Sequence, residues 1–196
     1  MALSGWNGRR GQYPGVTPRR GFALGLIAGF IHYAGTVYWT GATVQTFGGL
    51  PWPVAAFVAG LLALYMATFI GGVGAITALF VRRFGLSGLL LAPPAWVALE
   101  YLRGHLFGGF PWIPLGNTMI TLLPVAQLAS LLGVYGLSLF VGLVNAGFAV
   151  VALASGRTRM AAAAATLAMI AAVSVWGDSG WPATRSSRAA RRFAWD

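Results

Sequence analysis

The sequence lacks cysteine and lysine altogether, and only three of its 196 residues are acidic. Without cysteine, this chain can form no disulfide framework, no cysteine-ligated metal site and no cysteine nucleophile. Charged residues make up 8% of the chain, whereas a soluble domain carries about 25%. Because 58% of the residues are hydrophobic, a disordered protein is excluded as well. This composition predicts a protein whose surface faces lipid.

All of the basic residues are arginines, and their placement is more informative than their number. Eight of them lie before or between the long apolar runs in four pairs, which are Arg9-Arg10, Arg19-Arg20, Arg82-Arg83, and Arg157 with Arg159. This spacing is typical of the cytoplasmic loops of a multi-pass membrane protein, where positive charge sets the orientation. The net charge of +10 is therefore not expected to indicate nucleic-acid binding.

The apolar runs predict about five transmembrane helices, since roughly 20 residues rising 1.5 Å each cross a hydrocarbon core of about 30 Å. The expected spans are residues 22–44, 54–81, 86–102, 134–154 and 160–176. Pro124 and Gly133 divide the long run before the fourth span, so the piece up to residue 132 is expected to be interfacial or re-entrant. The predicted fold is an all-α membrane protein with a cytoplasmic N-terminus and a periplasmic C-terminus.

Three regions are expected along the chain. Residues 1–21 form a basic lead that is rich in glycine, proline and arginine, and residues 22–176 form the multispanning membrane domain. Residues 177–196 carry four arginines without any periodicity. We expect the lead and the tail to be disordered.

The first span carries small and polar residues at spacings of three and four, which places them on one helical face. They are Gly25, Gly29, His32, Thr36, Thr40 and Thr43. Two interpretations are open. The stripe is either a packing seam of small residues, with the threonines bonded to backbone carbonyls, or the polar lining of a headgroup-sized cavity.

The sharper signal is the pair Glu100 and Arg103, which are three residues apart in the third span. The helical rise places them about 21 Å and about 26 Å along that span. Charges at such a depth are costly unless they are paired. They form either a structural ion pair or a site where the Arg103 fork meets a phosphate or carboxylate. His105 could assist Arg103 in such a site, but a lone histidine at the interface is more often only solvated. No complete catalytic, metal or cofactor pattern is present.

The string EYLRGHLFGGFPWIPLG, residues 100–116, resembles a signature of bacterial apolipoprotein N-acyltransferases. TVYWTGATVQTFGGLPWP, APPAWVALEYLRG and LLGVYGLSLFVGLVNA extend the resemblance over about residues 19–176. It implies a multi-pass protein of the bacterial inner membrane that holds a periplasmic nitrilase-like domain. In that family, a Glu, a Lys and a Cys transfer an acyl chain from a phospholipid to the α-amine of a lipoprotein's lipidated N-terminal cysteine, the last step of lipoprotein maturation.

The resemblance covers only the membrane domain, so we expect a truncated or frame-shifted product that is inactive alone and carries no catalytic residue. Neither a cofactor nor a metal is expected, and the partners implied are membrane phospholipid and a lipoprotein. The resemblance also implies an outer rim on which the missing domain and its lipid would rest. Its residues are Tyr38, Trp39, Phe47, Gly48, Gly49, Glu100, Arg103, Gly104, Phe110, Pro111 and Trp112.

A second class of function is open. The chain is alternatively a non-enzymatic membrane scaffold or a small transporter subunit, in which Glu100, Arg103 and His32 line a permeation path. Transporters commonly show internal repeats, and this sequence shows none.

Overall fold

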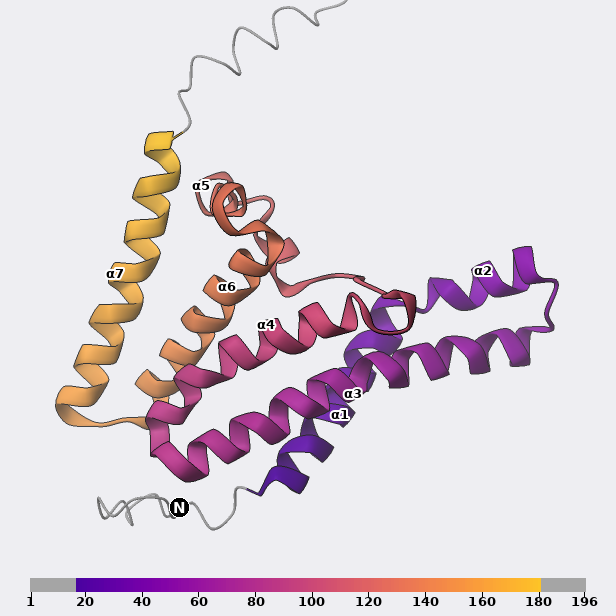
Figure 1. Cartoon of the computed structure of the whole chain (residues 1–196), viewed down its shortest axis with the longest axis horizontal. Coiled ribbons are helices and arrows are strands. Elements are labelled where there is room, and N and C mark those ends of the chain that lie inside the picture. The colour runs from indigo at the N-terminus through magenta and orange to yellow at the C-terminus, as the bar shows by residue number, and fades with distance from the viewer. Residues whose placement is uncertain (1–16, 181–196) are drawn as a thin grey trace, which may run out of the picture.

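A computed structural model describes residues 17–180, and within that range every regular element is a helix. The predicted all-α fold is therefore confirmed. Figure 1 shows the helices in chain order. The α-helices are α1 (Pro18–Thr36), α2 (Trp39–Gly48), α3 (Trp52–Phe84), α4 (Ala92–Arg103), α5 (Leu123–Ala126), α6 (Ala129–Leu153) and α7 (Gly156–Gly180). The 3₁₀ segments are η1 (Gly85–Leu91), η2 (Leu106–Gly108) and η3 (Leu115–Met119).

Prolines define where several helices begin. Pro18 opens α1 directly after Thr17, whose hydroxyl accepts a hydrogen bond from the Arg20 amide at 3.3 Å. Proline also lies within the first two positions of α3, α4 and α5. Its fixed φ suits the first turn, where its missing N–H removes no intrahelical bond. The local sequence thus sets these starting points before any tertiary contact forms.

Helices α1 and α3 pack unusually closely because glycines line both sides of their contact. A Cβ atom added to Gly74 would lie 2.2 Å from the carbonyl oxygen of Gly21, and one added to Gly25 would lie 2.5 Å from that of Ile70. Small residues at four-residue spacing permit this approach of two membrane helices. The packing-seam interpretation of the stripe is confirmed at Gly25, and at Gly29, whose added Cβ atom would lie 2.9 Å from Cβ of Ile70.

The first expected span, residues 22–44, is not one straight helix. α1 ends at Thr36, and α2 begins at Trp39 with its axis turned by 54°. The hydroxyls of Thr36 and Thr40 bond to the carbonyls of His32 and Val37, at 3.0 Å and 2.7 Å. Such back-bonding competes with the helical ladder and favours bending. The expected single polar face is therefore divided between two helices.

Fewer helices meet the requirements of a membrane span than the five expected. Within residues 17–180, three stretches are long and apolar enough, namely Trp52–Arg103, Ala129–Leu153 and Gly156–Ser179, and a fourth results if the bent pair α1 and α2 is counted as one. The first stretch contains two of the expected spans, because η1 joins α3 directly to α4 and the chain doubles back there (Figure 1). α4 has only 12 residues, about 18 Å of helix, so it is too short to cross alone.

Two chain reversals depend on glycine. Gly85 has φ +67° and ends α3. A Cβ atom on Gly88 would lie 2.3 Å from the carbonyl oxygen of Phe80, so η1 presses against the end of α3. Gly133, with φ +63°, interrupts the start of α6. This break, and the start of α5 at Leu123 with Pro124 in its first turn, confirm the expected division of the run from 122 to 154.

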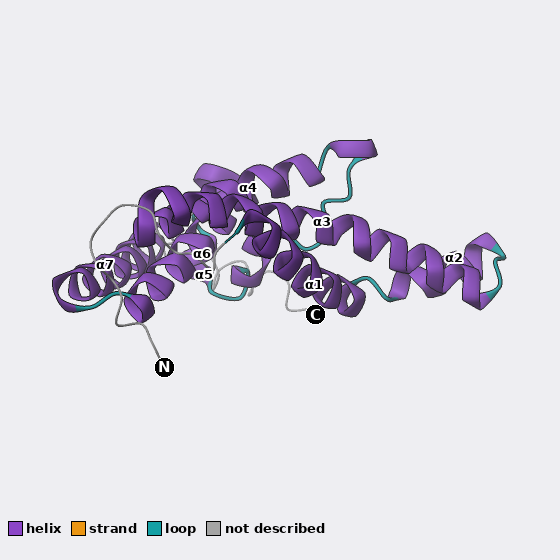
Figure 2. Cartoon of the chain, turned by 90° about the horizontal axis from the view of Figure 1, so that it is seen from below, coloured by secondary structure: helices purple, strands orange, loops and turns teal. Residues whose placement is uncertain are grey.

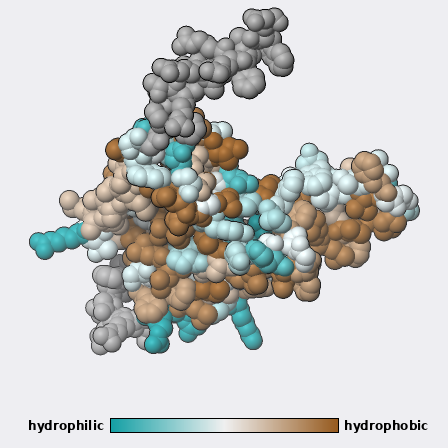
Figure 3. Space-filling view, turned by 45° about the horizontal axis from the view of Figure 1, so that its top comes forward, coloured by the Kyte–Doolittle hydropathy of each residue, from teal (hydrophilic) through white to brown (hydrophobic). Residues whose placement is uncertain are grey.

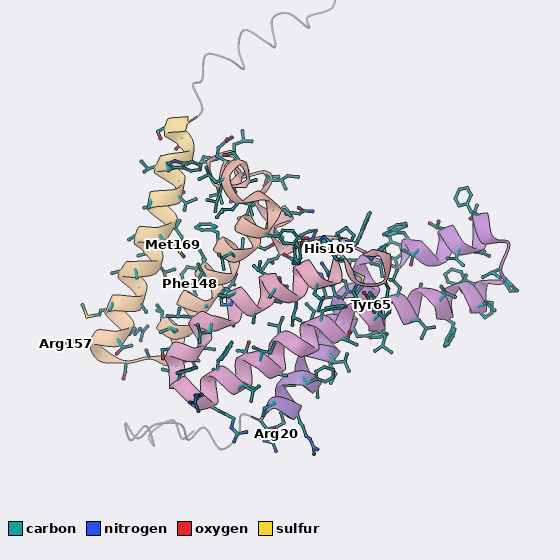
Figure 4. The ribbon with its side chains drawn as sticks, viewed as in Figure 1. Arg20, Tyr65, His105, Phe148, Arg157 and Met169 are labelled. Carbon is teal, nitrogen blue, oxygen red and sulfur yellow. The ribbon has the colours of Figure 1, made fainter. Side chains whose placement is uncertain are left out.

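The helices form a bundle from which one hairpin projects. α2 and the first half of α3 pack together and extend away from the other helices in both ribbon views (Figures 1 and 2). We call residues 39–64 the α2–α3 arm. In Figure 3, hydrophobic residues cover much of the face shown, and hydrophilic side chains project mainly from its lower and left edges. Arg20 and Arg157 both lie at the lower end of the molecule in Figure 4, where α3 also ends.

The helical region extends beyond the expected domain limits of 22 and 176. Residues 18–21 belong to α1 and residues 177–180 to α7, so these parts of the expected disordered lead and tail are helical. A Cβ atom on Gly177 would lie 1.8 Å from the carbonyl oxygen of Pro124, so α7 packs against α5 at that point. The remainder of the lead and of the tail lies outside the described residues.

The glycine contact between α1 and α3 gives the first prediction. Gly74→Ala should force the helices apart and lower the free energy of unfolding by roughly 1–3 kcal/mol. Gly60→Ala is the matched control, because nothing lies within 4 Å of its added Cβ atom and alanine gains up to about 1 kcal/mol in helix propensity. Thermal unfolding in detergent measures both. Equal midpoints would contradict the close packing.

Candidate functional site

Residues 104–122 join α4 to α5 across the end of the bundle opposite Arg20 and Arg157 (Figures 1 and 4). This 104–122 segment contains two non-glycine residues with positive φ, Phe107 at +55° and Ile113 at +49°. Positive φ is especially costly for a β-branched side chain such as isoleucine. Conformations of this kind persist only where the surroundings impose them, so the contacts around Ile113 identify what holds the segment.

Arg103 holds the segment on one side of Ile113. Its side chain is only 2% exposed. One terminal nitrogen donates a hydrogen bond to the hydroxyl of Tyr33 on α1, and the other donates to the carbonyl oxygen of Trp112 at 3.2 Å. The guanidinium carbon also lies 5.4 Å from the centre of the Tyr33 ring, within reach of a cation–π interaction. Arg103 thus ties α1, α4 and the segment together.

Glu100 holds the other side. Its side chain is 6% exposed, and one carboxylate oxygen accepts hydrogen bonds from the backbone N–H of Leu115 at 2.7 Å and the indole N–H of Trp96 at 3.3 Å. The attachment points of Glu100 and Arg103, at residues 115 and 112, therefore flank Ile113. We call these two residues with their backbone contacts the Glu100–Arg103 clamp.

The two charges do not hydrogen-bond to each other. The second carboxylate oxygen of Glu100 and the Nε atom of Arg103 are buried without a hydrogen-bond partner. Both residues line one cavity of about 10 Å³, together with Tyr33, Phe69, Ile70, Val73, Trp96 and Leu99. Each charged group is therefore only partly satisfied by hydrogen bonds. The guanidinium faces protein, so a phosphate could reach it directly only if the clamp opened.

The structure brings part of the expected rim together. The rings of Trp39 and Trp112 lie 4.9 Å apart, and those of Phe110 and Trp112 lie 5.9 Å apart and stacked. Gly104 faces Pro111, since an added Cβ atom would lie 3.6 Å from that ring. Trp39, Phe110 and Trp112 thus form one aromatic cluster beside the clamp, at the start of the α2–α3 arm.

The other expected rim residues lie elsewhere. Phe47, Gly48 and Gly49 form the end of α2 and its turn into α3, at the tip of the α2–α3 arm and away from the clamp (Figure 1). Phe47 is 86% exposed. Tyr38 lies at the bend between α1 and α2 and is also exposed. These four residues do not share a pocket with Glu100 and Arg103.

Both histidines are exposed, and neither joins the clamp. His32 is absent from the cavity that contains Glu100 and Arg103. The three residues proposed to line a permeation path therefore do not share one cavity. The Nδ1 atom of His105 lies 2.8 Å from the backbone carbonyl oxygen of Tyr101, within hydrogen-bond distance. The imidazole ring also packs on the Tyr101 ring, with the ring centres 4.2 Å apart. It lies at the end of α4 (Figure 4).

Two tyrosines that the sequence analysis missed support the segment. Tyr33 receives the Arg103 hydrogen bond, and the Tyr65 hydroxyl on α3 donates to the carbonyl of Leu106 at 3.4 Å. Tyr33 and Val37 continue the four-residue spacing of Gly21, Gly25 and Gly29, and that continuation was the available signal. No comparable signal pointed to Tyr65.

These features define a multi-pass helical membrane domain whose 104–122 segment is fixed by a buried polar clamp. Residues 10–147 match the family model described as the apolipoprotein N-acyltransferase N-terminal domain. The chain therefore belongs to the apolipoprotein N-acyltransferase family.

Three similar proteins carry the name apolipoprotein N-acyltransferase. The protein of Geobacter metallireducens is 44% identical over 131 residues, which is 65% of this chain and 24% of the relative. That of Vibrio parahaemolyticus is 38% identical over 67% of this chain and 26% of the relative. That of Chromobacterium violaceum is 34% identical over 84% of this chain and 31% of the relative. The chain thus spans about a quarter to a third of the length of these relatives.

The clamp gives the second prediction, Arg103→Lys. A lysine keeps the charge but cannot present two rigidly spaced donors, so contact with Tyr33 or with Trp112 must be lost. Because a hydrogen bond to a charged group contributes about 1.5–3 kcal/mol, amides of residues 110–119 should exchange hydrogen roughly tenfold faster or more. Arg83→Lys, at the exposed end of α3, is the control and should leave exchange there unchanged. Equal exchange in both variants would remove Arg103 from the clamp.

Proposed function

We propose that this chain acts as the membrane domain of an apolipoprotein N-acyltransferase in the bacterial inner membrane. Its role is to present the 104–122 segment as part of a rim where a phospholipid donor and a lipoprotein acceptor meet the catalytic domain. The family match over residues 10–147 supports the assignment. The observation that carries the role is the Glu100–Arg103 clamp, which holds both sides of a strained Ile113.

The aromatic cluster beside the clamp fits a lipid boundary. Trp39 and Trp112 are each a little over one-third exposed, so their rings present both a packed face and an open edge. Tryptophan gathers at membrane–water interfaces because its ring is apolar while its N–H finds polar partners. A phospholipid arriving at this rim would meet aromatic surface rather than the guanidinium, which is engaged by Tyr33 and Trp112.

Arg103 is accordingly a positioning residue and not a catalytic one. The thioester route that the family resemblance implies needs a thiolate, because a thiolate accepts and releases acyl groups readily. This chain contains no cysteine. We infer that the chain by itself positions lipid but does not complete the acyl transfer.

The rival function, a transporter subunit or scaffold, receives less support from the site. The cavity between Glu100 and Arg103 measures about 10 Å³, which is close to the space that one water molecule needs. A permeating solute would require a continuous and wider path. Substrate-dependent flux through proteoliposomes containing this chain would favour the rival.

The orientation in the membrane follows from the arginines. Arg20 and Arg157 lie at one end of the bundle and the 104–122 segment at the other (Figure 4). By the positive-inside rule the arginine end is cytoplasmic, so the segment is periplasmic.

The third prediction tests this orientation with single cysteines in a chain that has none. An impermeant maleimide added to intact spheroplasts should label Asn117→Cys in η3 and leave Ser87→Cys in η1 unlabelled. Both positions are exposed. After the membrane is permeabilised, both variants should be labelled, which controls for the reactivity of each cysteine. Labelling of Ser87→Cys but not Asn117→Cys in intact spheroplasts would contradict the proposed orientation.

The fourth prediction tests the proposed role in a chimera. Residues 10–147 of this chain replace the matching segment of the Geobacter metallireducens relative. The chimera, given phospholipid and a diacylated lipopeptide, should yield N-acylated peptide that mass spectrometry detects. Arg103→Lys in the chimera should lower the rate by roughly tenfold, since small displacements in positioning can cost as much or more.

Arg83→Lys is again the control and should keep the chimera's rate. The isolated chain should give no N-acylated product. A well-folded chimera without activity would overturn the proposed role, and product formed by the isolated chain would overturn its dependence on a separate catalytic domain.

A further inference from the structure

A groove between α4 and α6 plays no part in the proposed rim. It has a volume of about 480 Å³ and is lined by Pro94, Val97, Ala98, Tyr101, Tyr135 and Leu139. Its walls are almost wholly apolar. Small-molecule sites typically measure about 300–1,000 Å³, so the groove is large enough for an elongated apolar ligand.

Fixed contacts at both ends hold the groove open. At the end nearer the arginines, α4 and α6 touch where a Cβ atom on Gly142 would lie 2.9 Å from Cβ of Pro93. From there the two helices diverge toward the 104–122 segment (Figure 1). At the far end, Gly116 of η3 donates its N–H to the Ser138 hydroxyl of α6 at 2.8 Å. The groove is therefore part of the packed fold.

The end of the groove near the 104–122 segment carries polar groups. The rings of Tyr101 and Tyr135 lie 5.4 Å apart, edge to face, and the His105 ring lies 4.2 Å from that of Tyr101. The Tyr135 hydroxyl lies beside Gly104. Among residues 17–180, neither tyrosine hydroxyl forms a hydrogen bond within the protein. Two phenol hydroxyls that can donate hydrogen bonds therefore lie at this end of the apolar groove.

We propose that this groove binds one acyl chain of a membrane phospholipid, with the ester and headgroup region at Tyr101, Tyr135 and His105. Both walls belong to helical stretches suited to the membrane, so the groove opens toward hydrocarbon along its length. Its hydroxyls lie at the end where the chain carries its interfacial aromatics, which is the depth of lipid esters. The bound lipid is retained and not consumed. This inference does not require acyl transfer, only that α4 and α6 lie in a bilayer.

The test uses the full chain in nanodiscs of phosphatidylethanolamine and phosphatidylglycerol, doped with phosphatidylethanolamine that carries a diazirine on its palmitoyl chain. After illumination, mass spectrometry should find the label enriched on residues 94–101 and 135–139. Ala98→Trp fills the groove and should lower that labelling by about fivefold or more, a change of about 1 kcal/mol in binding. Leu79→Trp, on an exposed part of α3, is the control and should leave it unchanged.

A second pair of variants tests the polar mouth and does not depend on Ala98→Trp folding. Tyr101→Phe with Tyr135→Phe removes only two hydroxyls and should reduce the lipid retained in native mass spectrometry by about threefold. Ser87→Ala, which removes an exposed hydroxyl outside the groove, should retain the wild-type amount. Equal labelling of the groove and of the outer α3 face would overturn the proposal. Conversion of the retained lipid to a lyso form would show that it is an acyl donor. Cross-linking between two copies through residues 94–101 would assign the groove to self-association. Either result would overturn the proposal.

Discussion

The need to satisfy two buried charges governs the architecture of this membrane domain. Glu100 and Arg103 lie on the short helix α4, and each is more than nine-tenths buried. An unpaired charge at such a depth costs several kcal/mol, so the surroundings must supply partners. The partners come from α1, from Trp96 and from the backbone on both sides of Ile113. The irregular 104–122 segment therefore owes its shape to charges on a neighbouring helix.

The close packing of α1 and α3 connects the glycine pattern to that site. Gly21 and Gly25 allow the two backbones to approach, and Tyr33, two turns further along α1, is thereby placed within reach of Arg103. Tyr33 also belongs to the core formed with Val37, Ala63 and Met66. A single helix thus contributes packing at one end and a hydrogen-bond acceptor at the other. Loosening of the glycine contact would be transmitted to the clamp.

Local signals in the sequence predicted the helical class, the glycine seam and the break at Gly133, and they singled out Glu100 and Arg103 as charges that need partners. Each of these depends on spacing within a few residues or on composition. The clamp itself could not be predicted, because Tyr33 and Arg103 are 70 residues apart and their contact exists only after α1, α3 and α4 have packed. The positive φ of Ile113 is likewise imposed from outside, since isoleucine has no preference for it. The bend after Thr36 was missed because its threonines were interpreted as one face.

The length of α3 has a consequence for the surrounding membrane. Its 33 residues measure about 50 Å, compared with a hydrocarbon core of about 30 Å. Helices tilt by at most about 40°, which still leaves α3 close to 40 Å tall, about the full thickness of the bilayer with its headgroups. The 104–122 segment meets α3 at Tyr65, 13 residues from Trp52, so the tip of the α2–α3 arm extends up to about 20 Å beyond the segment. Hydrophobic mismatch would make the local thickness of the bilayer a determinant of how steeply the α2–α3 arm stands.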